Sequence, residues 1–167
     1  MKKKYACCVP FLVLLPALSI MSAIAAPVVP GTYNATLIGA EEVPSTGSTG
    51  VGTAIFWLSA DNTTMHYKIA VAWTINITMS HIHLAPRGVN GAVVVWLYPS
   101  APPAKLIPGV FGGLLAEGDV TAANLVGSLE NQSLSSLLAQ MDAGNTYVNV
   151  HTTEFPGGEI RGQITKS

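Results

Sequence analysis

The sequence predicts an all-β protein, namely an antiparallel Greek-key β-sandwich with immunoglobulin-like connectivity and one short helix. Hydrophobic and polar residues alternate with a period of two in at least seven short segments. Sixteen glycines and 11 prolines punctuate these segments. The chain of 167 residues is 49% hydrophobic and only 10% charged, which suits one well-buried core and short strands better than long surface helices.

The alternating segments give the expected strands in chain order. The second and third form a hairpin around the turn signal Ala60-Asp61-Asn62, with Tyr67, Ile69, Val71 and Trp73 on one face of the third. Residues 99–113, rich in proline and glycine, are expected to form a long irregular connection. The expected strands are 32–38, 51–58, 65–73, 79–84, 92–98, 114–120, 147–152 and 159–165.

Residues 133–143 break the period of two and predict the helix. Leu134, Leu137, Leu138 and Met141 recur at helical spacing, and this stripe is expected to seal the core rather than to form a binding groove. Asn131 or Ser133 is expected to cap the start of the helix, and Gly144 stands where a C′ glycine belongs.

Residues 1–26 have the pattern of a cleaved secretory signal peptide, which leaves residues 27–167 as one mature domain. Three lysines precede an apolar stretch, and Ala23-Ile24-Ala25 forms a small-x-small cleavage site. A retained membrane anchor is the alternative, but Pro10 and Pro16 interrupt the stretch. Cleavage would remove both cysteines, Cys7 and Cys8, so the mature chain would hold no disulfide.

Export would also change the charge balance. Loss of Lys2, Lys3 and Lys4 from eight basic residues leaves five basic against nine acidic residues. This excess of negative charge argues against nucleic acid, and against a membrane surface after cleavage, as partners. Four sequons mark sites for glycosylation in a host with the machinery, or arise by chance in turns; they begin at Asn34, Asn62, Asn76 and Asn131.

Three histidines are candidate metal ligands. In a strand over 79–84, His81 and His83 lie on the face opposite Ile82, and His151 lies opposite Val150 on a later strand. A His-x-His pair joined by a third histidine suits copper or zinc. The alternative is that these rings are structural and bond to one another or to carbonyl groups beneath the loop 85–91. His66, beside Lys68, is expected to face solvent.

Four further residues are expected to support the site. Tyr147 and Asn149 share the face of His151, and Glu159 and Arg161 share a face of the last strand. Glu159 and Arg161 are expected to pair with each other or with Asn149. We find neither a Gly-x-Ser-x-Gly elbow nor a glycine-rich phosphate loop before a helix, so no catalytic residue is assigned.

Several motifs together resemble the CHRD (chordin) domain family. They are Glu42-Val43-Pro44, His81-Ile82-His83 with Asn90-Gly91, the run from Gly144 to Thr152, and the run from Phe155 to Gln163. The resemblance spans about residues 32–165 and assigns 27–167 to one CHRD domain. It implies an extracellular module, which in chordin binds secreted growth factors.

The order of His81, His83 and His151 is also similar to that of three copper ligands in Cu/Zn superoxide dismutase, another Greek-key sandwich. We find no bridging histidine after the His-x-His strand and no zinc-ligand set. The sequence therefore favours a secreted, non-catalytic binding or structural module with a single histidine metal site for copper or zinc. The alternative is a copper or zinc protein with dismutase-like redox activity. The expected partner is an extracellular protein or a metal ion. Adhesion at a cell surface is a weaker alternative.

Overall fold

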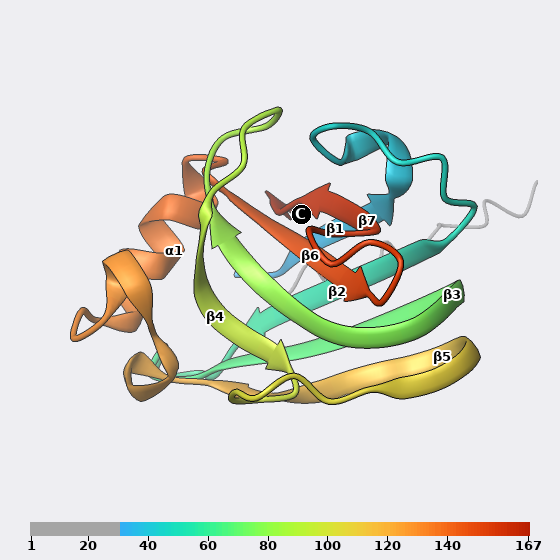
Figure 1. Cartoon of the computed structure of the whole chain (residues 1–167). Coiled ribbons are helices and arrows are strands. Elements are labelled where there is room, and N and C mark those ends of the chain that lie inside the picture. The colour runs from blue at the N-terminus through green and yellow to red at the C-terminus, as the bar shows by residue number, and fades with distance from the viewer. Residues whose placement is uncertain (1–30) are drawn as a thin grey trace, which may run out of the picture.

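The computed structural model describes residues 31–167 and shows an antiparallel β protein with one α-helix (Figure 1). This confirms the predicted all-β class. The predicted signal peptide lies outside the described residues. The strands are β1 Tyr33–Ile38, β2 Val51–Leu58, β3 Met65–Leu84, β4 Ala92–Tyr98, β5 Ile107–Val120, β6 Thr146–Thr152, β7 Ile160–Gln163 and β8 Thr165–Lys166; the helix is α1 Leu134–Asp142.

The strand β3 organises the molecule. We expected separate strands over 65–73 and 79–84, but β3 runs continuously for 20 residues. Its first part pairs with β2 and β5, and its second part pairs with β4 and β6. The bend between these parts has positive φ angles of 57° at Trp73 and 55° at Asn76, a conformation that non-glycine residues seldom adopt. One strand therefore serves both layers of the predicted sandwich.

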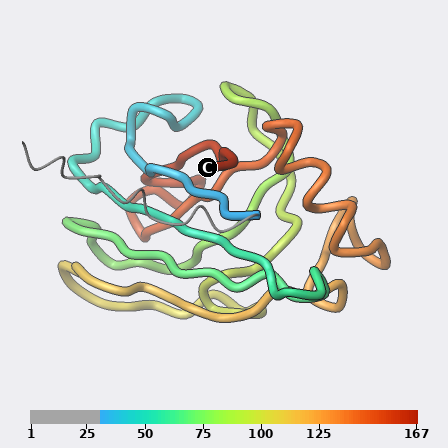
Figure 2. The backbone as a smooth tube through the Cα atoms, turned by 180° about the vertical axis from the view of Figure 1, so that it is seen from behind, coloured from blue at the N-terminus to red at the C-terminus, as the bar shows by residue number. Residues whose placement is uncertain are grey.

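The layers also meet through the first and last strands. β1 pairs with β2 on one side and contacts β7 on the other, and β7 pairs with β6. Since β6 and β2 both pair with β3, the hydrogen-bonded strands close into a flattened barrel. Figure 2 shows β1 beside the C-terminal segment, where it pairs with β8.

Two local predictions were wrong. Trp73 does not share the buried face of Tyr67 and Val71, because the bend turns it outward and leaves 67% of it exposed. Residues 107–113 are not irregular but form the first half of β5. Because β5 pairs only with β3 among the described strands, Pro108 removes no donor that another strand needs.

The core lies inside the barrel, and α1 closes one end of it (Figure 1). Leu134, Leu137 and Met141 of the helix are buried and Leu138 packs against them at the edge, which confirms the sealing stripe. Ser133 occupies the N-cap position without a side-chain capping bond. Gly144 follows the helix at φ +70°, as the C′ prediction requires. No helix in the stretch from residue 31 onward is long and apolar enough to cross a membrane.

Candidate metal centre

The register of β3 against β6 brings the three predicted histidines together. His81 and His83 of β3 lie opposite Asn149 and Tyr147 of β6, and His151 follows two residues after Asn149. The intervening Ile82 and Val150 are fully buried and point into the core. The alternation of the strands thus places the three imidazoles on the opposite face of this layer, as the sequence predicts.

The three rings form a compact, buried cluster, which we call the histidine cluster. One nitrogen of each ring can be chosen so that all three lie within 4.8 Å of one another. His81, His83 and His151 are only 3%, 8% and 5% exposed. His81 Nδ1 lies 3.0 Å from His151 Nε2, so these two rings are within direct hydrogen-bonding distance.

Two backbone carbonyls fix the protonation of His83 and His151. His83 Nδ1 donates to the carbonyl oxygen of Gly91, and His151 Nδ1 donates to that of Pro156, both at 3.0 Å. Because a carbonyl oxygen only accepts, each Nδ1 must carry the hydrogen and each Nε2 must present a lone pair. The neutral ring of His151 therefore accepts from His81 Nδ1 in the metal-free protein.

The lone pairs of this cluster are incompletely satisfied. His81 Nε2 and His83 Nε2 are buried without a hydrogen-bond partner among the described residues. A buried polar atom without a partner costs about 1–3 kcal/mol. A metal ion held by His83 Nε2, His151 Nε2 and one ring nitrogen of His81 would give His83 Nε2 the partner that it lacks. The donor set fits a borderline or soft transition metal.

All three imidazoles are held in the uncharged form that metals require. Burial, and then the neighbouring His151 and His83, lower the pKa of His81 to about 3. Burial also lowers the pKa of His83 to about 4, although its bond to Gly91 acts in the opposite direction. The pKa of His151 is lowered as well, again by burial. At neutral pH few protons compete for the ligand nitrogens.

His83 is part of a stack of side chains that also contains Tyr147 and Arg161. The Tyr147 ring lies parallel to that of His83, with ring centres 4.9 Å apart and an interplanar angle of 7°. The Arg161 guanidinium carbon lies 3.8 Å from the centre of the same Tyr147 ring. The Tyr147 hydroxyl accepts a bond from the amide of Gly91, whose carbonyl orients His83. Tyr147 and Arg161 therefore adjoin the cluster, as predicted.

Among the described residues Glu159 and Arg161 form no ion pair with each other, although Arg161 lies opposite Asn149 in the register of β6 with β7. Arg161 donates instead to Asn90 Oδ1 and to the carbonyl of Val89, both at 3.0 Å. Glu159 precedes β7 and accepts a bond of 2.7 Å from Ser48. The chain leaves the regular strand at Glu159, so the spacing of two no longer puts its side chain beside Arg161.

Glu42 is a site residue that the sequence analysis missed. It is 6% exposed and accepts a hydrogen bond of 3.0 Å from Asn149 Nδ2. Burial raises the pKa of Glu42 to about 7, while the charge of Arg161 acts against the rise. Gly158 permits this contact, because a Cβ there would lie 2.6 Å from Glu42 Oε1. Glu42 comes from the loop after β1, and no strand periodicity relates it to the histidines.

Trp96 of β4 is the second missed neighbour. Its ring meets that of His81 edge to face, with centres 4.2 Å apart. The pairing of His81 with Trp96 between β3 and β4 places it there. The strand over 92–98 was predicted, but its register against His81 was not.

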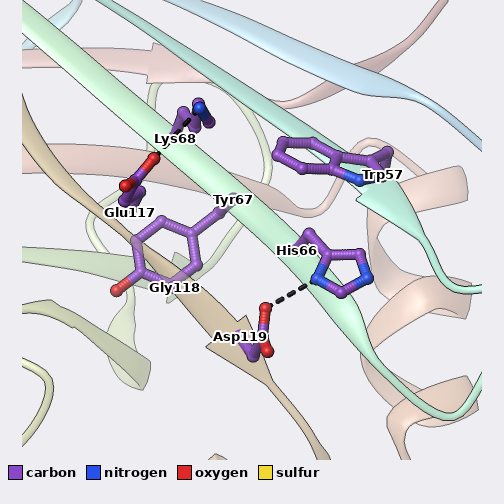
Figure 3. Close-up of a pocket in the computed structure, with 7 residues that line it drawn as sticks. All are labelled: Trp57, His66, Tyr67, Lys68, Glu117, Gly118 and Asp119. Atoms are coloured by element: carbon purple, nitrogen blue, oxygen red, sulfur yellow. Dashed lines mark hydrogen bonds and ion pairs between the residues drawn. The ribbon is translucent and has the colours of Figure 1, made fainter.

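His66 is not a member of the histidine cluster and lines a separate hollow at the surface (Figure 3). Its side chain is 33% exposed, and its Nδ1 lies 2.6 Å from Asp119 of β5. Trp57 and the ion pair of Lys68 with Glu117 line the same shallow hollow of about 300 Å³. This confirms that His66 faces the surface, and its acidic partner had not been predicted.

Fold and site together describe an all-β domain with a histidine cluster beneath its connecting loops. A family model for the CHRD domain matches residues 33–164. The chain belongs to the CHRD-domain family. Searches of curated proteins and of solved structures found no match. The likeness to Cu/Zn superoxide dismutase therefore stays a prediction from the order of the three histidines.

Proposed function

We propose that this protein is a secreted CHRD module that binds one copper or zinc ion through His81, His83 and His151. The observations that support this most directly are the three ligand nitrogens within 4.8 Å of one another and the unpartnered Nε2 of His83. Calcium and magnesium prefer oxygen ligands, so a cluster of imidazoles argues against both. A bound copper ion would supply one-electron chemistry, and zinc would supply a Lewis acid.

The burial of the cluster favours binding over catalysis. The three rings are at most 8% exposed, so a substrate has little direct access to the ligand atoms. His83 and His151 are also tied to the carbonyls of Gly91 and Pro156, which holds the cluster in one arrangement. We therefore propose a module that stores or presents an ion, or is stabilised by one, outside the cell, where it meets an extracellular protein partner.

The basic residues support the proposal that nucleic acid is not a partner. Arg161 is buried, and three other basic residues form ion pairs with acidic residues. A nucleic acid would have to compete with these carboxylates for each cation. The three pairs are Lys68 with Glu117, Arg87 with Glu41, and Lys166 with Asp142.

Metal titration of the purified protein tests the proposal. We expect one equivalent of Cu(II) or Zn(II) to bind, and His83→Ala to weaken this binding by more than about 100-fold, since even outer-shell changes cost 10–100-fold. His66→Ala is the matched control, because its imidazole lies on the same strand but outside the cluster. Circular dichroism should verify that each variant folds. Equal affinities for the parent protein and His83→Ala would overturn the proposal.

The dismutase-like alternative has a separate test. If the metal-loaded protein turned over superoxide steadily and His83→Ala abolished this activity, the non-catalytic part of the proposal would be wrong. Metal binding with no turnover above that of the free ion would support a binding module.

A further inference from the structure

Arg161 has an unusual position for a positive charge. It is 1% exposed and is among the largest fully buried side chains in the described part of the protein. Its hydrogen-bond acceptors, Asn90 Oδ1 and the Val89 carbonyl, are both neutral. Its guanidinium also lies over the face of Tyr147, and its charge lowers the pKa of Glu42 against the effect of burial. Among residues 31–167, no carboxylate forms an ion pair with it within 4.0 Å.

The charge of Arg161 is separated from His83, one of the candidate metal ligands, by the ring of Tyr147. The Tyr147 ring stacks on Arg161 at 3.8 Å and is parallel to the ring of His83 at 4.9 Å. The field of the guanidinium therefore reaches the histidine cluster through protein rather than through water. In a buried environment the effective dielectric constant is well below that of water, and charges at this range still interact.

The histidine cluster itself offers no negative charge. Three neutral imidazoles leave the whole charge of a bound ion uncompensated. The repulsion from Arg161 is twice as large for a divalent ion as for a monovalent ion at the same place. We propose that Arg161 is a specificity-determining residue of this site. Its positive charge, which lies against Tyr147, makes the site favour monovalent copper, Cu(I), over divalent copper or zinc. This inference rests on the proposed function.

Glu42 carries the opposite charge to Arg161 and therefore provides a comparison within the same protein. Glu42 is buried and accepts a hydrogen bond from Asn149, which lies opposite His81 and two residues before His151. Its negative charge should favour the divalent ion, against the effect of Arg161. If the inference is right, neutralising Arg161 and neutralising Glu42 must shift the preference in opposite directions. A merely structural role of either residue does not predict opposite shifts.

The reduction potential of the copper-loaded protein tests the inference, with Cu(I) and Cu(II) affinities measured against competing chelators. The measurements belong at pH 8, where Glu42 is ionised. We expect Arg161→Gln to lower the ratio of Cu(I) to Cu(II) affinity by about 10-fold, equivalent to a fall of about 59 mV in the one-electron potential. Glu42→Gln should raise the ratio.

The outcomes separate the two proposals. If the parent protein bound neither copper nor zinc, both the metal site and this inference would be wrong, and if it bound zinc but no copper, only this inference would be wrong. If copper bound but the potential did not move in Arg161→Gln, or moved upward, only the role of Arg161 would be overturned. Should Arg161→Gln fail to fold, Glu42→Gln decides, because an unchanged or lowered potential in that variant contradicts the electrostatic argument.

Discussion

The two parts of β3 place the same side chain in opposite surroundings. Near its start, His66 lies at the surface beside Asp119, in the open hollow of Figure 3. Near its end, His81 and His83 are buried and their partners are another imidazole and a backbone carbonyl. The Nδ1 of His66 is engaged by a carboxylate, whereas the neutral, buried surroundings of the histidine cluster leave nitrogen lone pairs without a partner. The bend at Trp73 separates these two environments.

The two parts of β3 should differ most in the free energy of unfolding that is lost when a side chain is truncated to alanine. Ile82 is fully buried behind the histidines, whereas Lys68 is about half exposed on the surface of the first part. We expect Ile82→Ala to lower the free energy of unfolding by about 2–5 kcal/mol, through lost apolar burial and the cavity left behind. Lys68→Ala should cost at most about 1 kcal/mol. Urea unfolding of the metal-free proteins measures both values. Similar costs for the two variants would show that the parts do not differ in packing.

The pH dependence of stability should reveal the buried histidines. An unfolded histidine has a pKa of about 6.5, whereas the pKa values of folded His81 and His83 are about 3 and about 4. The unfolded chain therefore binds more protons below pH 6.5, and the stabilising effect of neutral burial, complete above that pH, is lost as the pH falls toward 3–4. In urea unfolding of the metal-free protein across pH 4–7, we expect His83→Gln to reduce this acid-side loss.

Glu42 should act in the opposite direction in the same experiment. Its folded pKa of about 7 is above the ordinary value of 4.5, so its contribution is complete below pH 4.5 and lost as the pH rises through 7. Compared with the parent protein, Glu42→Gln should therefore lose less stability as the pH rises from 4 to 7. If both variants changed the slope in the same direction, the histidines and Glu42 would not be the groups responsible.

The smallest effect is expected at the surface. Asp119→Asn removes the charge beside His66, and both side chains are at least one-third exposed. Solvent screens such a pair, so we expect a loss of no more than about 1 kcal/mol at neutral pH. Metal affinity should stay within about 2-fold of the parent value, since the pair is not part of the histidine cluster. A large loss of metal affinity would contradict the separation of the two parts of β3.

The sequence predicted which faces the strands present but not how the strands lie against one another. The period of two was enough to place His81, His83 and His151 on one side of their strands. The gathering of these residues also depends on the register of β3 with β6, which no local pattern encodes. Trp96 was missed for the same reason, because its contact with His81 follows from the register of β3 with β4.

Loops and bends account for the remaining differences. Glu42 reaches Asn149 from the loop after β1, across 107 residues of sequence. The alternation that suggested a buried Trp73 stops at a positive φ angle, which strand propensity does not anticipate for tryptophan. Residues 107–113 contain the proline and glycines typical of a loop, but β5 tolerates them because its only partner among the strands of residues 31–167 is β3.

The shared strand should also govern how the protein opens. Amides along β3 are bonded to β2 and β5 at one end and to β4 and β6 at the other. If either end of β3 separated from its partner strands, the closed barrel of strands would open. Such partial opening would lose many contacts and gain little chain freedom. We expect the amide hydrogens at both ends to exchange with deuterium at one common slow rate, with no early-opening half.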